Sequence, residues 1–232
     1  MERFKILTLI KSVEIMSNLS RFTKIGRKIV GVGRNYKAHA IELKNEVPSS
    51  PMLFLKPTSS YIQSGERIEI PLGCSEIHHE IELGVIIKEK CSRVSDTEAP
   101  SYIGGYVLAL DMTCRDFQRT AMAKGYPWAM AKGFDTSCPV SEFISIDKIP
   151  DPGHVQLKCF VNDEMRQDGN TEDMIFSVSN LISYISDYFT LEEGDLILTG
   201  TPEGVGPVRN GDVIRGTIPN VIDIEFIVGR ES

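Results

Sequence analysis

The pattern of hydrophobic and polar positions is most informative from His78 to Ile87. Side chains alternate between the two faces of a strand, so Glu80 and Glu82 would share one face and Ile81 would point to the other. After Glu82 the alternation gives way to Leu-Gly-Val-Ile-Ile, an apolar run typical of a strand buried on both faces. This stretch therefore predicts a strand that carries two carboxylates towards the protein interior. The alternative, which alternating charge on a strand more often indicates, is a solvated sheet face.

Other short apolar segments predict further strands. They cover residues 28–33, 51–57, 102–111, 155–160, 165–166, 196–198, 213–218 and 222–228. The turn at Asn162-Asp163-Glu164 suggests a hairpin, and residues 37–43 suggest a helical turn. One apolar stripe with helical spacing, from Val178 to Phe189, predicts a helix that Ser177 or Ser179 would cap. Many short strands and few helices predict a mainly β (α+β) fold with mixed sheets.

The length fits one domain, or one domain with a short appendage, and the net charge favours small molecules as partners. The chain has 232 residues, 41% of them hydrophobic and 25% charged, which is ordinary for a globular protein. A net charge of -7 argues against a surface that binds nucleic acid or an anionic membrane. We therefore expect neither a nucleic-acid partner nor a membrane partner.

The N-terminal segment differs from the rest. Residues 1–28 hold seven Lys or Arg against Glu2 and Glu14, about +5 in an acidic chain. Their apolar run, residues 6–10, is far too short to span a bilayer. We interpret residues 1–27 as a basic surface tail or a targeting segment, and residues 28–232 as the main folded domain.

The cysteines indicate a reducing compartment. Five are scattered along the chain without any CxxC spacing: Cys74, Cys91, Cys114, Cys138 and Cys159. An odd number in this arrangement predicts neither a disulfide framework nor a zinc site. Each is expected to be a small buried hydrophobe.

Two carboxylates buried together need a positive partner. At ~5 Å and an effective dielectric of about 20, they repel each other by roughly 3 kcal/mol. A divalent cation between them would offset this repulsion. Asp111 ends the apolar strand at 102–111 and either caps a following helix or joins Glu80 and Glu82. In the second case three carboxylates would select Mg²⁺ or Mn²⁺, or less readily Ca²⁺, over zinc.

Other segments carry candidate chemistry. His39 and Glu42 would lie on one side of a helical turn, where a carboxylate can orient an imidazole that activates water, although such pairs are also common on surfaces. Lys132 stands among apolar neighbours, and Lys56 follows an apolar strand as either a structural or a site residue. The Thr-Gly-Thr-Pro loop after residue 198 could hold a carboxylate through its N–H and hydroxyl groups.

Taken together, these motifs resemble the fumarylacetoacetate hydrolase family, in particular its short mitochondrial members of the acylpyruvase and oxaloacetate decarboxylase or tautomerase type. The ordered set comprises Gly33-Arg34-Asn35-Tyr36 with His39 and Glu42, His79 to Gly84, Asp111-Met112-Thr113 with Arg115 and Gln118, Trp128 with Ala131-Lys132, and Leu198 to Pro202. The resemblance covers roughly residues 19–230.

The resemblance implies a mixed β-sandwich roll, a homodimer and a mitochondrial matrix location. It also implies Mg²⁺ or Mn²⁺ held by Glu80, Glu82 and Asp111, and a lid that carries the catalytic pair His39 and Glu42. The remaining positions it implies are catalytic Lys132 and the substrate contacts Arg34, Tyr36, Arg115, Gln118 and Thr201.

The function implied is chemistry on α-keto acids through a metal-stabilised enolate. It comprises acylpyruvate hydrolysis to pyruvate and a carboxylate, oxaloacetate decarboxylation, and oxaloacetate keto–enol tautomerisation. Two alternatives stay open, a muconate-type isomerase of aromatic catabolism and a non-catalytic Mg²⁺-dependent module that binds dicarboxylates.

Overall fold

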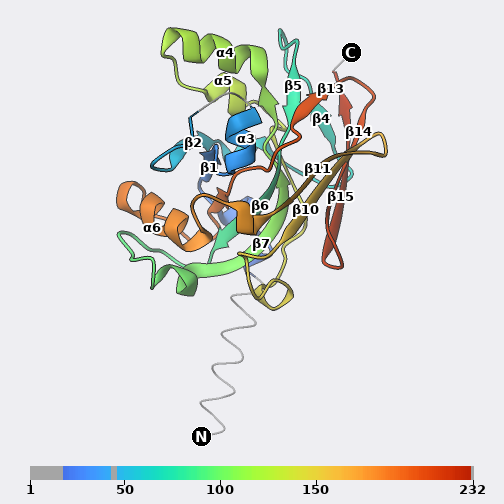
Figure 1. Ribbon diagram of the computed structural model, residues 1–232. Helices are drawn as coiled ribbons and strands as arrows, with labels where there is room; N and C mark the ends of the chain where they lie inside the picture. Colours follow the sequence, from blue (N-terminus) through green and yellow to red (C-terminus); the bar gives the residue numbers. More distant parts are fainter. Residues whose placement is uncertain (1–17, 43–45, 231–232) are drawn as a thin grey trace, which may run out of the picture.

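Strand β6 (Ile81–Ile87) is buried at every position and lies inside the largest sheet, as its apolar run predicts. The computed structural model describes residues 18–42 and 46–230, and within these ranges the strands form three sheets (Figure 1). The large sheet has the order β2-β1-β12-β6-β7-β9-β3 and is mixed, because β1 pairs parallel with β12 and antiparallel with β2. Its other strands are β2 (Met52–Lys56), β1 (Ile29–Gly33), β12 (Leu196–Leu198), β7 (Ile103–Leu110), β9 (Cys138–Val140) and β3 (Tyr61–Gln63).

Two smaller sheets complete the β structure. The second sheet has the order β11-β10-β14-β15-β4, and the third has the order β13-β5-β8. Their strands are β11 (Glu164–Asn170), β10 (Gln156–Val161), β14 (Val213–Ile218), β15 (Ile222–Gly229), β4 (Arg67–Glu69), β13 (Gly206–Val208), β5 (Ile77–His79) and β8 (Thr113–Cys114). The predicted hairpin is confirmed: Asn162 and Asp163 form a two-residue turn between β10 and β11, and both have positive φ.

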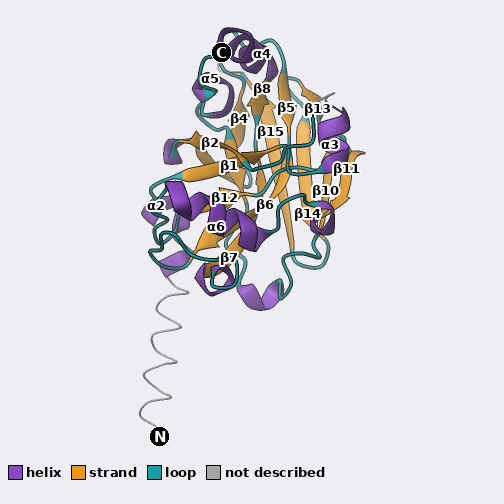
Figure 2. Cartoon of the chain, turned by 60° about the vertical axis from the view of Figure 1, so that its left-hand side comes forward, coloured by secondary structure: helices purple, strands orange, loops and turns teal. Residues whose placement is uncertain are grey.

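Short helices surround the strands (Figure 2). They are α2 (Phe22–Ile25), α3 (Lys37–Glu42), α4 (Arg115–Lys124), α5 (Ala129–Lys132) and α6 (Val178–Tyr188), with 3₁₀ turns at η1 (Thr58–Ser60), η2 (Ala99–Tyr102), η3 (Ile146–Lys148) and η4 (Thr171–Asp173). The predicted helix is confirmed as α6, and Ser177 caps it by accepting the Asn180 N–H. The mainly β fold is therefore also confirmed. Of the helices in the described ranges, none has the length and apolar character needed to cross a bilayer.

Both faces of the large sheet are covered, which explains why β6 is apolar at every position except Glu82. On one face Ile81 and Leu83 join a core cluster that includes Ile214 and Phe226 of the second sheet. On the other face Ile86 belongs to a second cluster, with Leu19 and Phe22 from the segment before β1. Leu19 and Phe22 fall within the predicted basic segment 1–27, so its described part packs on the domain. Residues 1–17 of that segment lie outside the described residues.

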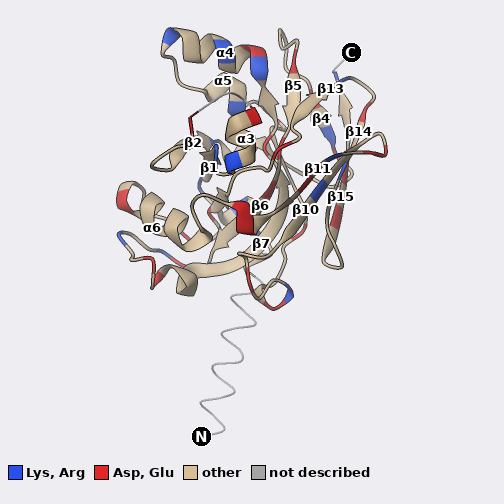
Figure 3. Ribbon diagram, viewed as in Figure 1, with Lys and Arg blue, Asp and Glu red and all other residues tan. Residues whose placement is uncertain are grey.

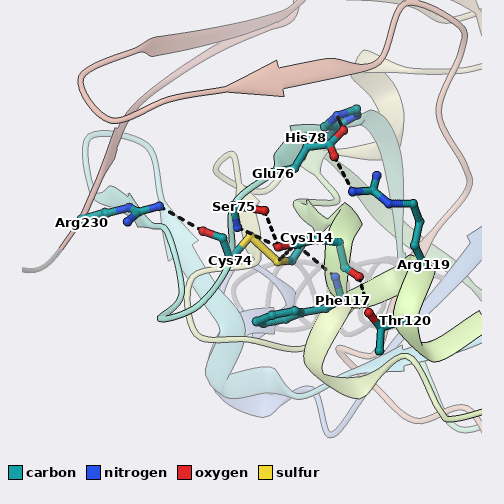
Figure 4. Close-up of a disulfide and its surroundings, with 10 residues drawn as sticks. Cys74, Ser75, Glu76, His78, Cys114, Phe117, Arg119, Thr120 and Arg230 are labelled. Atoms are coloured by element: carbon teal, nitrogen blue, oxygen red, sulfur yellow. Dashed lines mark hydrogen bonds and ion pairs between the residues drawn. A yellow bond between two sulfur atoms is a disulfide. The ribbon is translucent and has the colours of Figure 1, made fainter. Parts of the chain in front are cut away.

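The expectation that all five cysteines are unpaired is wrong for two of them. Cys74 and Cys114 form a disulfide, with their Cα atoms 6.2 Å apart (Figure 4). The bond joins the segment before β5 to the residue that precedes α4. Because 40 residues separate the two cysteines, no local spacing motif could have revealed the pair. Cys91, Cys138 and Cys159 are free and buried, as expected.

Counting reactive thiols tests the disulfide between Cys74 and Cys114. Burial raises the pKa of Cys138 and of Cys159 to about 12, so neither thiol ionises at pH 8 in the native protein. With a thiol-reactive chromophore and no reductant, we expect no rapid reaction of native protein and three reactive thiols after unfolding. Reduction before unfolding should raise this to five. Five reactive thiols without reductant would show that Cys74 and Cys114 are not bonded.

Candidate metal centre

Three carboxylates converge where the chain passes from β5 in the small sheet to β6 in the large one. Glu80 lies at this passage, and the pairing of Ile81 with Leu110 places Asp111 opposite it, so that the Asp111 N–H donates to the Glu80 carbonyl (2.8 Å). One oxygen each of Glu80, Glu82 and Asp111 lies within 4.8 Å of the others, and all three residues are buried. Asp111 does not cap a helix, because α4 starts at Arg115 after its N-cap Cys114.

Two buried cations donate hydrogen bonds to these acids. The Lys132 ammonium, at the end of α5, donates to Glu80 Oε2 (2.9 Å) and to Asp111 Oδ2. The Arg115 guanidinium, from the first residue of α4, donates to Glu80 Oε1 (2.5 Å). In both views α4 and α5 lie together at one end of the molecule, and Figure 3 shows basic residues on α4. The two short helices therefore bring positive charge to a strand-borne carboxylate.

These contacts shift the ionisation of the acids and of the lysine. Burial by itself would raise the pKa of Glu80, but the charges of Lys132 and Arg115 outweigh burial and lower it. Burial would likewise lower the pKa of Lys132, but Asp111 and Glu80 outweigh it and raise that pKa. Glu82 differs, because burial and the charges of Asp111 and Glu80 together hold its pKa well above the usual value. A further positive charge next to Glu82 would therefore stabilise the cluster.

The donor set fits a hard divalent cation. All three groups offer carboxylate oxygens, which Mg²⁺, Mn²⁺ and Ca²⁺ prefer. Asp111 Oδ1 is buried and accepts no hydrogen bond, although the Lys56 ammonium lies 2.8 Å away. Lys56 supplies positive charge beside this oxygen but no hydrogen bond, so the oxygen keeps lone pairs that can bind a further cation. Glu80, Glu82 and Asp111 could therefore hold the ion together.

The loop that follows β12 holds a carboxylate as predicted, but the carboxylate is the protein's own. The Gly200 N–H donates to Glu82 Oε2 (2.7 Å). Gly200 has a φ of +98°, and a Cβ there would lie 2.7 Å from the Asn35 Cβ, so only glycine allows this close approach. The Thr201 hydroxyl donates to the Ile81 carbonyl (2.7 Å), so it is committed to the backbone.

Helix α3, the segment predicted to form a lid, lies beside the acids, since His39 and Glu80 line the same cavity. His39 is buried, and its Nδ1 lies 3.2 Å from Glu42 Oε2. The Gly204 N–H donates to Glu42 Oε1 (3.1 Å), which ties the lid to the loop after β12. Arg34, just before the lid, has a φ of 60°, an unfavourable left-handed conformation for arginine that often marks functional sites.

A small cavity of about 60 Å³ opens between these groups. The predicted site residues that line it are Arg34, His39, Glu80, Arg115, Gln118 and Lys132. A larger cavity of about 900 Å³ lies elsewhere, but none of the three converging acids lines it, so we place the site at the small one. The other predicted residues, Tyr36, Glu42, Glu82, Asp111 and Thr201, do not line the small cavity. Tyr36 is buried with an unpaired hydroxyl, and burial followed by the Glu82 charge raises its pKa.

Sequence reasoning missed Gln167, on β11 of the second sheet. Its Oε1 accepts the Ile81 N–H (3.1 Å), and its amide donates to the Thr201 hydroxyl (2.8 Å). It also accepts from His79, whose pKa falls to about 4 because of burial, so the ring is neutral at pH 7. Gln167 therefore joins β6 to the loop after β12. A single Gln in a polar strand gives no signal of this role.

The chain is similar to known proteins in both sequence and fold. Residues 28–228 match the family described as Fumarylacetoacetate (FAA) hydrolase C-terminal. The chain is 55% identical to the mitochondrial oxaloacetate decarboxylase of Dictyostelium discoideum, over 90% of this chain and 96% of that protein. It is 50% identical to the mitochondrial oxaloacetate tautomerase FAHD1 of Homo sapiens, over 91% and 96% respectively. The crystal structure of fumarylpyruvate hydrolase from Pseudomonas aeruginosa, in complex with Mn²⁺ and pyruvate, is similar in fold, with a TM-score of 0.85, 34% identity and coverage of 89% and 91%.

Glycine substitutions test the role of the loop after β12. Gly200→Ala should cost about 3 kcal/mol of unfolding free energy and weaken Mn²⁺ binding about tenfold, because the new Cβ displaces Asn35 and the donor to Glu82. Gly211→Ala is the matched control, with a φ of +91° but nothing within 4 Å of the Cβ. It should cost only about 1 kcal/mol and leave Mn²⁺ binding unchanged. Urea unfolding measures stability and calorimetry measures Mn²⁺ affinity. If Gly200→Ala and Gly211→Ala changed both quantities equally, Gly200 would have no specific role in holding Glu82.

Proposed function

Because the chain belongs to the fumarylacetoacetate hydrolase family, we propose that it is a divalent-metal-dependent enzyme that acts on small α-keto acids, with oxaloacetate as its principal substrate. The observation that carries this proposal is the convergence of Glu80, Glu82 and Asp111 beneath a cavity lined by cations. The two curated relatives compared above are named for oxaloacetate chemistry, which supports the choice of substrate.

Glu80, Glu82 and Asp111 would hold Mg²⁺ or Mn²⁺, with Ca²⁺ less suited to the task. The Mn²⁺ in the Pseudomonas aeruginosa relative supports a cation of this class. When bound, such an ion acts as a Lewis acid for negative charge that develops on the 2-oxo oxygen of an α-keto acid. The protein contributes a buried, oxygen-only donor set that fits such an ion.

Side chains around the cavity would bind and orient the anionic substrate. Three carboxylates and a divalent ion carry a net charge of about -1, so Arg115 and Lys132 are needed to offset a dianion. Arg34 adds a third positive group to the cavity wall, and Gln118 accepts from Arg115 (2.8 Å), which fixes the guanidinium.

If oxaloacetate is bound by these groups, one bound orientation would serve two reactions. In decarboxylation the C3–C4 bond breaks, carbon dioxide leaves, and the electron pair remains on C3 until a proton is added there. In tautomerisation a proton leaves C3 and a proton is added to the 2-oxo oxygen, with no carbon–carbon bond broken. Lys132 lies within reach of the acids at the cavity wall and would supply positive charge in both reactions.

A second candidate activity is acylpyruvate hydrolysis. His39 lines the cavity and Glu42 orients its ring, so the pair could take a proton from water. The hydroxide would attack the distal carbonyl, and carbon–carbon cleavage would release a carboxylic acid and, after protonation at C3, pyruvate. This dyad also disfavours a non-catalytic dicarboxylate-binding module, which needs no water-activating pair.

The remaining alternative is a muconate-type isomerase. An activity panel separates the possibilities: acylpyruvates, oxaloacetate, its enol and a hydroxymuconate, each with and without a chelator. Activity on the hydroxymuconate alone would replace our proposal with the isomerase, and no activity on any of them would favour the binding module.

The two curated relatives are named as mitochondrial, and we propose the mitochondrial matrix for this chain too. The homodimer stays a prediction.

Removal of one acid tests the metal site. Glu80→Gln should weaken Mn²⁺ binding at least about 100-fold and abolish turnover of oxaloacetate, because it removes one ligand charge and one of the two acidic partners of Lys132. The control is Glu225→Gln, which breaks an exposed pair with Arg215 (2.7 Å) and should change neither property. Calorimetric titration with Mn²⁺ measures the binding. Wild-type Mn²⁺ affinity in Glu80→Gln would refute the site.

Comparison of two reactions tests the dyad. His39→Ala should slow acylpyruvate hydrolysis by about 10² to 10⁴, since only hydrolysis needs an activated water. Oxaloacetate decarboxylation should fall less than about tenfold. The matched variant is His154→Ala, an exposed histidine beside Glu172, and it should leave both rates unchanged. Steady-state kinetics with both substrates measure the two rates. An equal loss of hydrolysis and decarboxylation in His39→Ala would rule out water activation by His39.

A further inference from the structure

Lys56 is a buried cation to which the proposed reaction assigns no role. It ends β2, is 2% exposed and does not line the small cavity. An ammonium ion in a protein interior costs several kcal/mol unless hydrogen bonds and opposite charge compensate it. Its environment should therefore show what it does.

All three hydrogen bonds of Lys56 go to backbone carbonyls. Its ammonium donates to the carbonyls of Met112 (3.3 Å), Ser137 (2.8 Å) and Lys132. These carbonyls belong to the residue after Asp111 and to the segment that carries Lys132. Lys56 therefore ties β2 to the two segments from which Asp111 and Lys132 project.

The fourth neighbour of the ammonium is Asp111 itself. The Lys56 Nζ lies 2.8 Å from Asp111 Oδ1, but its donors are already used, so this oxygen receives charge and no hydrogen bond. Lys132 donates to the other oxygen, Oδ2. Lys56 thus stabilises the carboxylate electrostatically and leaves lone pairs of Oδ1 free for a cation.

We propose that Lys56 is a positioning residue of the metal centre: it holds the Asp111 carboxylate aligned for a divalent cation without contacting the substrate. This inference rests on the proposed function. A lysine that only joined backbone segments would stabilise the fold without affecting metal affinity in particular. The two roles are therefore separable by experiment.

The test is calorimetric titration of the purified full-length chain with Mn²⁺, together with thermal unfolding and oxaloacetate kinetics. Lys56→Met keeps much of the side-chain volume and removes the charge. We expect it to bind Mn²⁺ ten to a hundred times more weakly, the usual effect of losing a residue that orients a ligand. Saturating Mn²⁺ should restore most of kcat, because the residues of the cavity wall are intact.

Ser137→Ala is the control for a purely structural role. It removes the hydrogen bond from the Ser137 hydroxyl to the Lys132 carbonyl (2.9 Å) in the same segment and leaves the contact between Lys56 and Asp111 in place. It should lower the unfolding temperature without changing Mn²⁺ affinity more than about twofold. Folded Lys56→Met with wild-type Mn²⁺ affinity would overturn the proposal, and so would an equal loss of affinity in Ser137→Ala.

If Lys56→Met does not fold, Lys56→Arg tests whether Lys56 positions Asp111. The guanidinium keeps the charge but cannot place one nitrogen among three carbonyls and Asp111, so Mn²⁺ affinity should fall about tenfold. Undiminished affinity in this variant would overturn the proposal. The wild-type protein separates the two hypotheses: if it binds no Mn²⁺, the proposed function fails, whereas normal wild-type binding with unaffected variants removes only the role of Lys56.

Discussion

The site depends on the repulsion between three carboxylates buried within 4.8 Å of one another. Such a cluster is unstable in a low-dielectric interior unless positive charge is placed beside it. Three buried cations provide that charge: Lys132 and Arg115 through hydrogen bonds, and Lys56 through proximity to Asp111. The fold around the site can be understood as the means of bringing these six groups together.

The groups come from several parts of the architecture. The central strand β6 carries Glu82 and directly follows Glu80, and Asp111 directly follows the central strand β7. The edge strand β2 supplies Lys56, and α4 and α5 supply Arg115 and Lys132. The disulfide between Cys74 and Cys114 holds the segment before β5 against the start of α4, next to Arg115 (Figure 4). Acids on rigid central strands and cations on short peripheral elements together make a pre-organised centre.

The lid and the loop after β12 complete the enclosure. Glu42 accepts the Gly204 N–H, so the lid rests on the same loop whose Gly200 binds Glu82. The cavity beneath the lid is small and its wall is cationic, which suits a compact dianion. Substrate recognition and metal binding would therefore share one electrostatic arrangement, and this links the family membership to a plausible chemistry.

The sequence by itself determined the local features, because they depend on neighbouring residues. The 3.6-residue stripe with Ser177 indicated α6, the turn residues Asn162 and Asp163 indicated a hairpin, and the alternation at Glu80 and Glu82 placed two acids on one face. The ordered motifs indicated the family, and the family match and structural similarity agree with that.

Only the tertiary structure decided which distant residues meet. Cross-strand register placed Asp111 opposite Glu80 and settled whether it caps a helix. The tertiary structure also brings Cys74 to Cys114, which is 40 positions away in the chain, and Lys56 to Asp111. The physical reason is that pairing register, disulfide partners and buried ion pairs depend on contacts between segments far apart in the chain, which no local pattern of residues encodes.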